Sequence, residues 1–564
     1  MGKLKLFLNL LLILFCVNIY SQIVPTKYYI QFTDKNNSPY TLSSPLVFLS
    51  QRALDRRTKQ GYSLDERDLP VNPSYIDSIL AAGNVTLLNI TKWLNGVTIL
   101  TSDSIALVNI NAFSFVQNVK AVAPLLSKSK RNNKFENDLY TNSSLEILNK
   151  KPKLKSKDSY DYGYSANQIE MIGLDYLHNL GYHGEDIIIA QLDAGFNNVD
   201  TMVVFDSLRN DNRILGVKDF VDHSGNVYSE HIHGMMVLSL MAGNIPGQLI
   251  GTSPKASFWL LRPENGDTEY IIEEYNWVSA AEFADSVGAD IINSSLGYSI
   301  FDDSLQNHTF ADLNGSTTVV SRGANIAASK GILVVNSAGN SAQTPWQRIL
   351  VPSDADSVLT VGAVDENGSY APFSSVGNTF DGRIKPDIVS QGANTVVAST
   401  QGGIMTGNGT SFSAPIISGA VACLWQANPN ATNMQLMEAI RKSASQYNNP
   451  DSLLGYGIPN FAIAHQLLAG ASINENKKDY FFTVFPNPFE DWISLDYIEN
   501  DSHLVTVELY DFCGRNIYSI KNFKNVIGYN TITINNLDEI SKGIYFLKIS
   551  EENKIFIRKL VKIS

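Results

Sequence analysis

Cysteine is scarce in this chain, with three residues out of 564. Cys16 lies in an apolar stretch near the N-terminus, and Cys423 and Cys513 are far apart in the sequence. A disulfide framework needs an even set of cysteines at short spacings, so the sequence predicts no structural disulfide. The disulfide-rich class of small secreted domains is excluded.

The chain also lacks a basic surplus and has few charges for its length. Its 43 basic and 55 acidic residues give a formal net charge of −12. Nucleic-acid binding needs a basic face that displaces counterions, so the charge balance argues against a nucleic-acid partner. Charged residues make up 17% and hydrophobic residues 44% of the chain, which is typical of a protein that folds in water.

Long apolar runs are absent beyond the N-terminus. The run at residues 6–17 follows two lysines and precedes small and polar residues, a pattern typical of a secretory signal peptide over residues 1–21. A membrane anchor is the alternative, but the run is shorter than the ~18–20 residues that span hydrocarbon. Phe15 before Cys16 disfavours lipidation. The mature protein is therefore predicted to have no transmembrane segment.

The length corresponds to about four folding units. Residues 22–126 have the pattern of a small α+β domain, with helices expected at residues 45–57 and 73–82 between short strands. Residues 127–161 are polar and rich in lysine, which indicates a linker that is either a solvated spacer or a place for proteolysis.

Residues 162–470 alternate apolar strand-like runs with helix-like stretches. This alternation predicts an α/β domain whose parallel sheet is covered by helices on both faces, with an active site at the carboxyl ends of the strands. After a polar linker at residues 471–478, residues 479–564 contain seven short alternating strands. They predict an all-β, immunoglobulin-like sandwich.

Three short motifs in the α/β region carry candidate catalytic side chains. Asp193 ends an apolar strand, His233 opens an apolar helix, and Ser411 opens another helix after a glycine and a threonine. Each also has an ordinary structural explanation as a turn carboxylate, a packed or capping histidine, or a serine N-cap. Their order, Asp, His, Ser, differs from the trypsin-like order His, Asp, Ser and from the α/β-hydrolase order Ser, Asp, His.

With the segments around them, these motifs resemble the subtilisin-like serine proteases, the subtilase family. In that family the aspartate lies in D-[ST]-G, the histidine in H-G-T-H and the serine in G-T-S-[MF]-[AS]-x-P. The corresponding blocks here are DAG, HGMM and GTSFSAP, and further matches are GTSPKA, SLG and KPDI. The resemblance implies a subtilisin-like α/β fold.

The same resemblance implies a role for each residue. Ser411 would be the nucleophile that forms an acyl-enzyme, His233 the general base that a weakly nucleophilic hydroxyl needs, and Asp193 the group that orients the imidazole. The side-chain amide of Asn340 would stabilise the oxyanion together with the backbone N–H of Ser411.

Two walls of the substrate cleft are implied in the same way. The wall residues are Ser295, Leu296 and Gly297 on one side and Ala338 and Gly339 on the other. The first of these walls would pair with the peptide substrate as an added strand.

Three positions depart from the family pattern, and a fourth takes the less common of two residues. Ala194 replaces the usual hydroxyl residue, and Met235 and Met236 replace a threonine and a second histidine, so no catalytic group is lost. Phe412 stands where many relatives carry an oxidisable methionine, which predicts slow inactivation by peroxide. The altered histidine block motivates an alternative function, a catalytically impaired subtilase-fold protein that acts as a surface-binding protein or adhesin.

The flanking units have resemblances of their own. Residues 22–126 resemble a subtilase propeptide, to be cut in the lysine-rich linker, with a non-inhibitory spacer as the alternative. Residues 479–564 resemble the type A sorting domain of the type IX secretion system, in the segments VFPNP, LYD followed by GR, GIYFL and KLVK. A carbohydrate-binding sandwich is the alternative.

Together these features predict a serine endopeptidase of protein and peptide substrates that is secreted or located on the cell surface. Export would use the Sec pathway and then the type IX machinery. No cofactor and no metal site are predicted. The acid-acting sedolisins are a second enzyme class, but they need a glutamate in place of His233 and an aspartate in place of Asn340.

Overall fold

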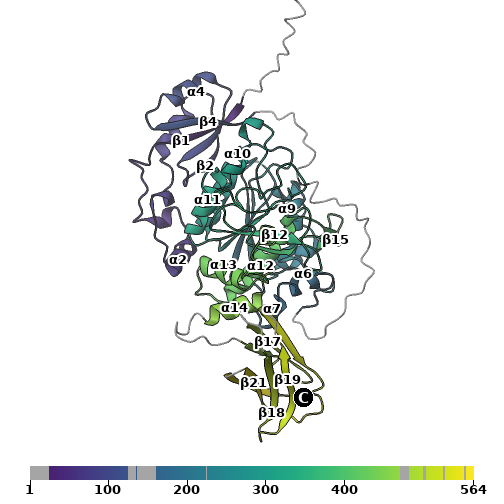
Figure 1. The fold of residues 1–564 in the computed structure, drawn as a ribbon. Helices are drawn as coiled ribbons and strands as arrows, with labels where there is room; N and C mark the ends of the chain where they lie inside the picture. Colours follow the sequence, from purple (N-terminus) through teal and green to yellow (C-terminus); the bar gives the residue numbers. More distant parts are fainter. Residues whose placement is uncertain are drawn as a thin grey trace, which may run out of the picture.

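The computed structural model describes residues 25–124, 135, 160–223, 225–470, 482–499, 504–524, 528–551 and 554–563. These residues form an N-terminal α+β domain, a central α/β domain and a C-terminal β-rich domain (Figure 1). The predicted signal peptide, the linker at 471–478 and most of the lysine-rich linker lie outside the described residues.

The N-terminal domain is an antiparallel sheet with the strand order β2-β3-β1-β4 and three helices. Apolar residues of the sheet and of the last two helices form its core, among them Ile30, Val97, Ile99, Ile79 and Ile110. Its elements are β1 (Pro25–Phe32), α2 (Gln51–Gln60), α3 (Pro73–Leu80), β2 (Thr86–Thr91), β3 (Gly96–Leu100), α4 (Ser104–Asn111) and β4 (Val116–Pro124).

The prediction of one helix over residues 45–57 is wrong. A short 3-10 turn comes first, and α2 begins only at Gln51. The reason is local, because the hydroxyl of Ser50 accepts a backbone N–H of the first helical turn and caps a new helix there. The helix ends at Gly61, whose left-handed φ of 76° suits a residue without a side chain.

A seven-stranded sheet with the order β13-β12-β11-β10-β5-β9-β6 is the middle layer of the central domain. All its strand pairs are parallel, which confirms the predicted α/β class. The strands are β5 (Ile188–Leu192), β6 (Ile214–Asp219), β9 (Ser257–Arg262), β10 (Ile291–Ser294), β11 (Leu333–Ser337), β12 (Val358–Val364) and β13 (Ile388–Gln391).

Helices cover both faces of this sheet, as Figure 1 shows. Leu333 and Val335 of β11 join the core beneath α9 and α12, whereas Val334 joins the core beneath α10 and α11. This is the period of two expected of a strand that is buried on both faces. The helices are α9 (His233–Ala242), α10 (Ile272–Val287), α11 (Val319–Ser329), α12 (Thr410–Ala427), α13 (Asn433–Lys442) and α14 (Phe461–Gly470). Shorter elements are α6 (Ala166–Glu170), α7 (Asp175–Asn179), α8 (Asp206–Asn210), β7 (Asn244–Ile245), β8 (Leu249–Ile250), β14 (Thr395–Ala398) and β15 (Ile404–Gly407).

The described part of the C-terminal domain contains seven strands, as the sequence predicts. They make two antiparallel sheets, β16-β17-β20 and β19-β18-β21-β22. Leu495 and Ile532 of the first sheet share one core with Val507 and Leu547 of the second, which is the arrangement of a β-sandwich. The strands are β16 (Phe482–Phe485), β17 (Ile493–Glu499), β18 (Leu504–Asp511), β19 (Asn516–Lys524), β20 (Gly528–Ile534), β21 (Gly543–Glu551) and β22 (Lys554–Lys562).

The N-terminal domain packs against α10 of the central domain (Figure 1). Glu282 of α10 accepts the backbone N–H groups of Lys92 at 2.7 Å and of Trp93 at 2.9 Å. The hydroxyl of Thr91 donates to the same carboxylate at 2.6 Å. One buried carboxylate thus accepts three hydrogen bonds from the end of β2 and the turn that follows it.

Buried ion pairs add to this contact. Asp285 of α10 has no exposed surface, and its carboxylate lies 2.5 Å from Nη2 of Arg56 and 2.8 Å from Nη2 of Arg57 in α2. Burial alone would raise the pKa of Asp285, but the cations of Lys92, Arg56 and Arg57 hold that pKa below its ordinary value. The carboxylate is therefore charged, and it joins the two domains electrostatically.

Cys423 is a buried thiol and Cys513 an exposed one, and both are free. Across the described ranges, no helix has both the length and the apolar character needed to cross a bilayer.

Candidate active site

The candidate catalytic residues lie where secondary-structure elements of the central domain begin or end. Asp193 directly follows β5 in the middle of the sheet, and His233 is the first residue of α9. Ser411 is the second residue of α12, which packs against α9 and four of the strands. The carboxyl ends of parallel strands are the edge at which α/β domains place their sites.

Asp193 and His233 are in direct contact. Nδ1 of His233 lies 2.7 Å from Oδ1 of Asp193, and neither side chain has exposed surface. The backbone N–H of Ala194 donates to the same oxygen at 2.8 Å. The carboxylate is therefore held in place although residue 194 has no side-chain hydroxyl. A carboxylate in this place favours the tautomer with hydrogen on Nδ1, which makes Nε2 the basic nitrogen.

Gly234 allows this close approach. A Cβ atom at residue 234 would lie 2.2 Å from the carbonyl oxygen of Gly195 and 2.9 Å from Cβ of Asp193. Any side chain here would force α9 away from the end of β5, and the imidazole would move with it. The glycine after the histidine is therefore a requirement of the geometry.

Ser411 enters the site from α12. The ring centroid of its neighbour Phe412 is 6.2 Å from that of His233, so the first turn of α12 lies beside the imidazole. The carbonyl oxygen of Ser411 accepts the hydroxyl of Ser295 at 3.0 Å, which ties this turn to one predicted wall of the cleft. Backbone N–H groups at a helix start favour negative charge, as an oxyanion requires.

Thr410 orients the amide of Asn340. Its backbone N–H and its hydroxyl both donate to Oδ1 of Asn340 at 2.9 Å. Because the amide oxygen is fixed in this way, the NH₂ group is left as the donor. The hydroxyl of Thr410 also accepts the backbone N–H of Gly339 at 3.0 Å. Sequence patterns alone did not point to a role for Thr410, although it lies in the GTS block.

The two predicted walls meet at Leu350. A Cβ atom at Gly297 would lie 2.7 Å from Cβ of Leu350, and a Cβ atom at Gly339 would lie 2.6 Å from its Cγ. Gly339 also has a φ of 102°, which disfavours other residues. The backbone N–H of Leu350 donates to the carbonyl of Ala338 at 3.0 Å. Small residues are therefore needed on both walls for packing as well as for access.

Comparison with known proteins covers all three domains. Residues 184–457 match the subtilase family, and residues 27–137 match the peptidase S8 propeptide domain of Bacteroidota. Residues 483–563 match a secretion system C-terminal sorting domain. The chain carries a subtilase domain. It is a subtilisin-like serine protease with a propeptide domain before the enzyme and a sorting domain after it.

Two related subtilisins illustrate the degree of similarity. Subtilisin NAT of Bacillus subtilis subsp. natto is 28% identical over 313 residues, which are 55% of this chain and 73% of that protein. The subtilisin of Bacillus pumilus is 28% identical over 53% of this chain and 98% of its own length. The similarity is thus confined to about half of the present chain.

Two solved structures are among the matches. MycP1 from the ESX-1 type VII secretion system is 20% identical, with a TM-score of 0.41 over 56% of this chain and 90% of that chain. The prenylagaramide maturation protease PagA is 23% identical, with a TM-score of 0.41 over 53% of this chain and 99% of that chain.

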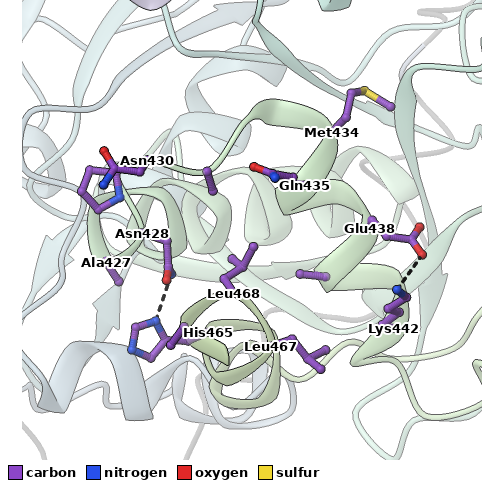
Figure 2. A pocket seen from close by; sticks show the side chains of 14 residues that line it. Ala427, Asn428, Asn430, Met434, Gln435, Glu438, Lys442, His465, Leu467 and Leu468 are labelled. Atoms are coloured by element: carbon purple, nitrogen blue, oxygen red, sulfur yellow. Dashed lines mark hydrogen bonds and ion pairs between the residues drawn. The ribbon is translucent and has the colours of Figure 1, made fainter. Parts of the chain in front are cut away.

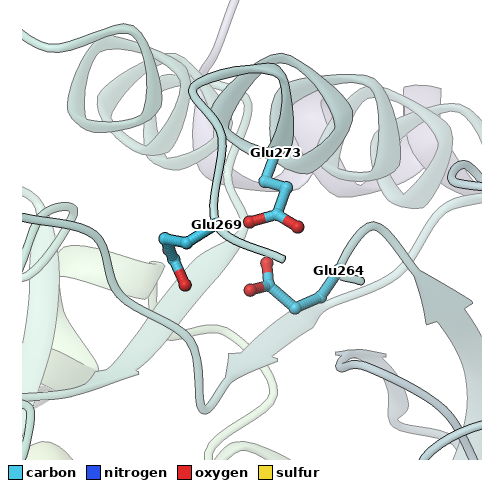
Figure 3. Close-up of side chains that lie close together, drawn as sticks. All are labelled: Glu264, Glu269 and Glu273. Atoms are coloured by element: carbon cyan, nitrogen blue, oxygen red, sulfur yellow. The ribbon is translucent and has the colours of Figure 1, made fainter. Parts of the chain in front are cut away.

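The subtilase domain also brings together three glutamates that no sequence motif connects. Glu264, Glu269 and Glu273 are buried, and each offers a carboxylate oxygen within 4.8 Å of the others (Figure 3). The hydroxyl of Tyr298 donates to Glu264 at 2.8 Å. Burial and these carboxylates raise the pKa of Tyr298 well above its ordinary value. Since Tyr298 follows Gly297, this hydrogen bond places Glu264 near the predicted wall that ends at Gly297. Carboxylate oxygens are ligands that a hard divalent cation accepts.

A cavity lies elsewhere in the domain. It has a volume of about 760 Å³ and is lined by the end of α12 and by α13 and α14, including Asn428, Met434 and His465 (Figure 2). Ala427 in its lining is sixteen residues after Ser411 in the same helix, which is about 24 Å along the axis. This cavity is therefore remote from the candidate catalytic residues.

Proposed function

We propose that this protein is a secreted serine endopeptidase, made as a proenzyme, in which Asp193, His233 and Ser411 are the catalytic triad. The contact of 2.7 Å between Asp193 and His233, at the start of a helix beside the first turn of α12, is the observation that carries this proposal. The subtilase match and the order of the three residues agree with it.

In the proposed reaction, Nε2 of His233 accepts the hydroxyl proton of Ser411 as Oγ attacks the carbonyl carbon of the substrate. The carbonyl oxygen becomes an oxyanion, which the amide of Asn340 and the backbone N–H of Ser411 stabilise. His233 then gives the proton to the leaving amine as the C–N bond breaks. Water, deprotonated by His233, attacks the acyl-enzyme and releases the acid, and Ser411 recovers its proton.

The substrate would lie between the two glycine-containing walls. Ser295, Leu296 and Gly297 follow the central strand β10, where their backbone can pair with an extended peptide. Ala338 and Gly339 follow β11 and lead directly to Asn340. A carbonyl carbon held between these segments is near both the nucleophile and the oxyanion donor.

Labelling with a serine-directed fluorophosphonate tests the reaction. The mature wild-type enzyme should be labelled at Ser411, the Ser411→Ala variant should not be labelled, and Ser229→Ala, which changes an exposed serine, should be labelled like the wild type. Equal labelling of wild type and Ser411→Ala would eliminate the serine mechanism. A wild-type protein that takes no label and cleaves no peptide would favour the surface-binding alternative.

The sorting domain supports export through the type IX machinery, and the N-terminal signal supports entry into the Sec pathway. Deletion of residues 479–564 should leave the protease in the periplasm. Secretion of the truncated protein at the wild-type level would contradict the sorting role and favour a carbohydrate-binding sandwich. The activity of the truncated enzyme, measured after cell lysis, serves as the control for folding of the catalytic domain.

A further inference from the structure

One aromatic side chain of the proenzyme lies on the proposed general base. The ring of Phe135 is stacked on that of His233, with centroids 4.3 Å apart and an angle of 26° between the planes. The centroid of His231 is 4.9 Å from that of Phe135. Phe135 is 6% exposed and lies within the residues that match the propeptide domain. An apolar ring is thus buried against the group that moves the proton.

His231 is held in position to receive this ring. Its Nδ1 accepts the backbone N–H of His233 at 3.1 Å, which fixes the imidazole orientation and places hydrogen on Nε2. On another side of the ring, a Cβ atom at Gly266 would lie 3.0 Å from Cδ2 of His231, so the loop after β9 packs closely there. The catalytic steps described above make no use of His231.

Phe135 also joins the apolar core next to the cleft. It belongs to the same buried cluster as Leu296 and Tyr298, which form or follow one predicted wall. Stacked and tilted aromatic rings gain stabilisation beyond the burial of their surface. An aromatic side chain buries about 150–250 Å². An aliphatic or charged side chain in the same place would lose the contact with two imidazoles.

We propose that His231 and the face of His233 form an aromatic-selective subsite of the cleft, which Phe135 fills in the proenzyme. The subsite selects an aromatic side chain close to the scissile bond, both in peptide substrates and at the site of maturation. This inference rests on the proposed triad, because it treats His233 as the base.

The reach of the base locates the aromatic residue relative to the bond that is cut. His233 must contact the leaving nitrogen, and an extended chain advances about 3.3–3.6 Å per residue. A side chain stacked on the imidazole therefore belongs to a residue within about three positions of the scissile bond. The propeptide match ends at residue 137, which agrees with a maturation site next to Phe135.

Quenched fluorescent peptides test the selectivity of the mature enzyme. The peptides differ at one position only, which carries Phe, Tyr, Leu, Ala or Lys, and the position is moved through the three residues on each side of the bond that is cut. At one position, kcat/KM for Phe and Tyr should exceed that for Ala and Lys about tenfold or more. Equal values for aromatic and small residues at every position would overturn the proposal.

Variants of His231 test which residue makes the selection. In His231→Ala, the ratio of kcat/KM for the Phe peptide to that for the Ala peptide should fall to within about threefold of one, mainly through KM. His231→Phe keeps a flat ring and should retain the ratio. The ratio does not depend on the amount of active enzyme, so partial misfolding does not imitate its loss. An unchanged ratio in His231→Ala would overturn the role of His231.

Maturation gives an independent readout. The proenzyme with Ser411 intact is allowed to process itself, and the new N-termini are determined by mass spectrometry. The main cleavage should lie within three residues of Phe135, unchanged in Phe135→Tyr and about tenfold slower in Phe135→Ala. A main cleavage near residues 150–157 that is insensitive to Phe135→Ala would contradict the subsite. If the wild-type enzyme takes no fluorophosphonate label and cuts no substrate, the proposed triad has failed instead.

Discussion

The imidazole of His233 and the carboxylate of Asp193 are 2.7 Å apart and fully buried, although forty residues separate them in the sequence. Two features of the chain produce this contact. Asp193 follows a central strand of the sheet, and the glycine after His233 lets α9 approach the end of that strand closely. The first prediction concerns what the carboxylate does for the base.

Replacement of Asp193 by asparagine should lower kcat by about 10⁴-fold, with a small effect on KM. The amide favours the wrong tautomer of the imidazole, and it does not stabilise the imidazolium that forms during the reaction. Steady-state hydrolysis of a chromogenic peptide measures both constants. Asp200→Asn makes the same chemical change at an exposed carboxylate and is the matched control. A loss of less than about tenfold in Asp193→Asn would show that the carboxylate is not part of the mechanism.

The second prediction concerns the oxyanion donor. Asn340→Ala should lower kcat by about 10²–10³ with KM little changed, the loss measured for one such donor in a subtilisin. Thr410→Val removes the hydroxyl that fixes Oδ1 of Asn340 and should lower kcat about tenfold, the worth of one hydrogen bond. Thr410→Ser keeps the hydroxyl and should retain most activity. Equal kcat in Thr410→Val and Thr410→Ser would contradict the orienting role.

The sequence predicts the architecture because its signals are local and repeated. Apolar runs such as the one around Val334 are buried on both faces, and that pattern requires helices on both sides of a parallel sheet. The short strands after residue 479 follow a different pattern, in which buried and less buried residues alternate, as in β18. The single helix expected at residues 45–57 failed because one capping side chain, Ser50, outweighed helix propensity.

The sequence could not predict contacts that depend on tertiary structure. The sequence links Asp193 and His233 only through their order along the chain and through the family resemblance. The distance between the two side chains depends on the fold. The contact of Phe135 with His233 joins a propeptide residue to the catalytic domain across 98 positions, and no spacing rule covers it. The glutamates around Glu264 come from a loop and a helix start, where acidic residues are common for other reasons.

The third prediction concerns the ion pairs between the propeptide and the enzyme. Arg57 is 2% exposed and lies within 3.0 Å of Asp68 and 2.8 Å of Asp285, so Arg57→Ala leaves buried carboxylates with fewer cations. This should lower the free energy of unfolding of the proenzyme by about 3–5 kcal/mol. Arg67→Ala, which removes a surface pair with Asp65, should cost less than about 1 kcal/mol. Urea denaturation in the Ser411→Ala background measures both, and equal losses would contradict the argument.

The fourth prediction concerns stability in acid. His178 is fully buried, with Nδ1 2.8 Å from the hydroxyl of Tyr162 and Nε2 3.1 Å from the carbonyl oxygen of Thr252. Burial lowers the pKa of His178 to about 4, and the neighbouring His183 adds to this effect, while the carbonyl of Thr252 and the carboxylate of Glu185 oppose it. The folded protein therefore keeps this imidazole neutral well below the pH at which an unfolded chain protonates it.

The sign of the pH dependence follows from proton uptake. Between pH 6.5 and pH 4 the unfolded state binds a proton at His178 that the folded state does not bind, so stability falls as the pH falls through this window. The contribution reaches about 3 kcal/mol at pH 4 and vanishes above about pH 7. In the Ser411→Ala background, urea unfolding measures the free energy of unfolding at about pH 7 and about pH 4. The decrease from the higher to the lower pH should be smaller for His178→Gln than for the exposed control His223→Gln. If the two variants lose the same stability in acid, then protonation of the unfolded chain at residue 178 does not contribute to the acid sensitivity.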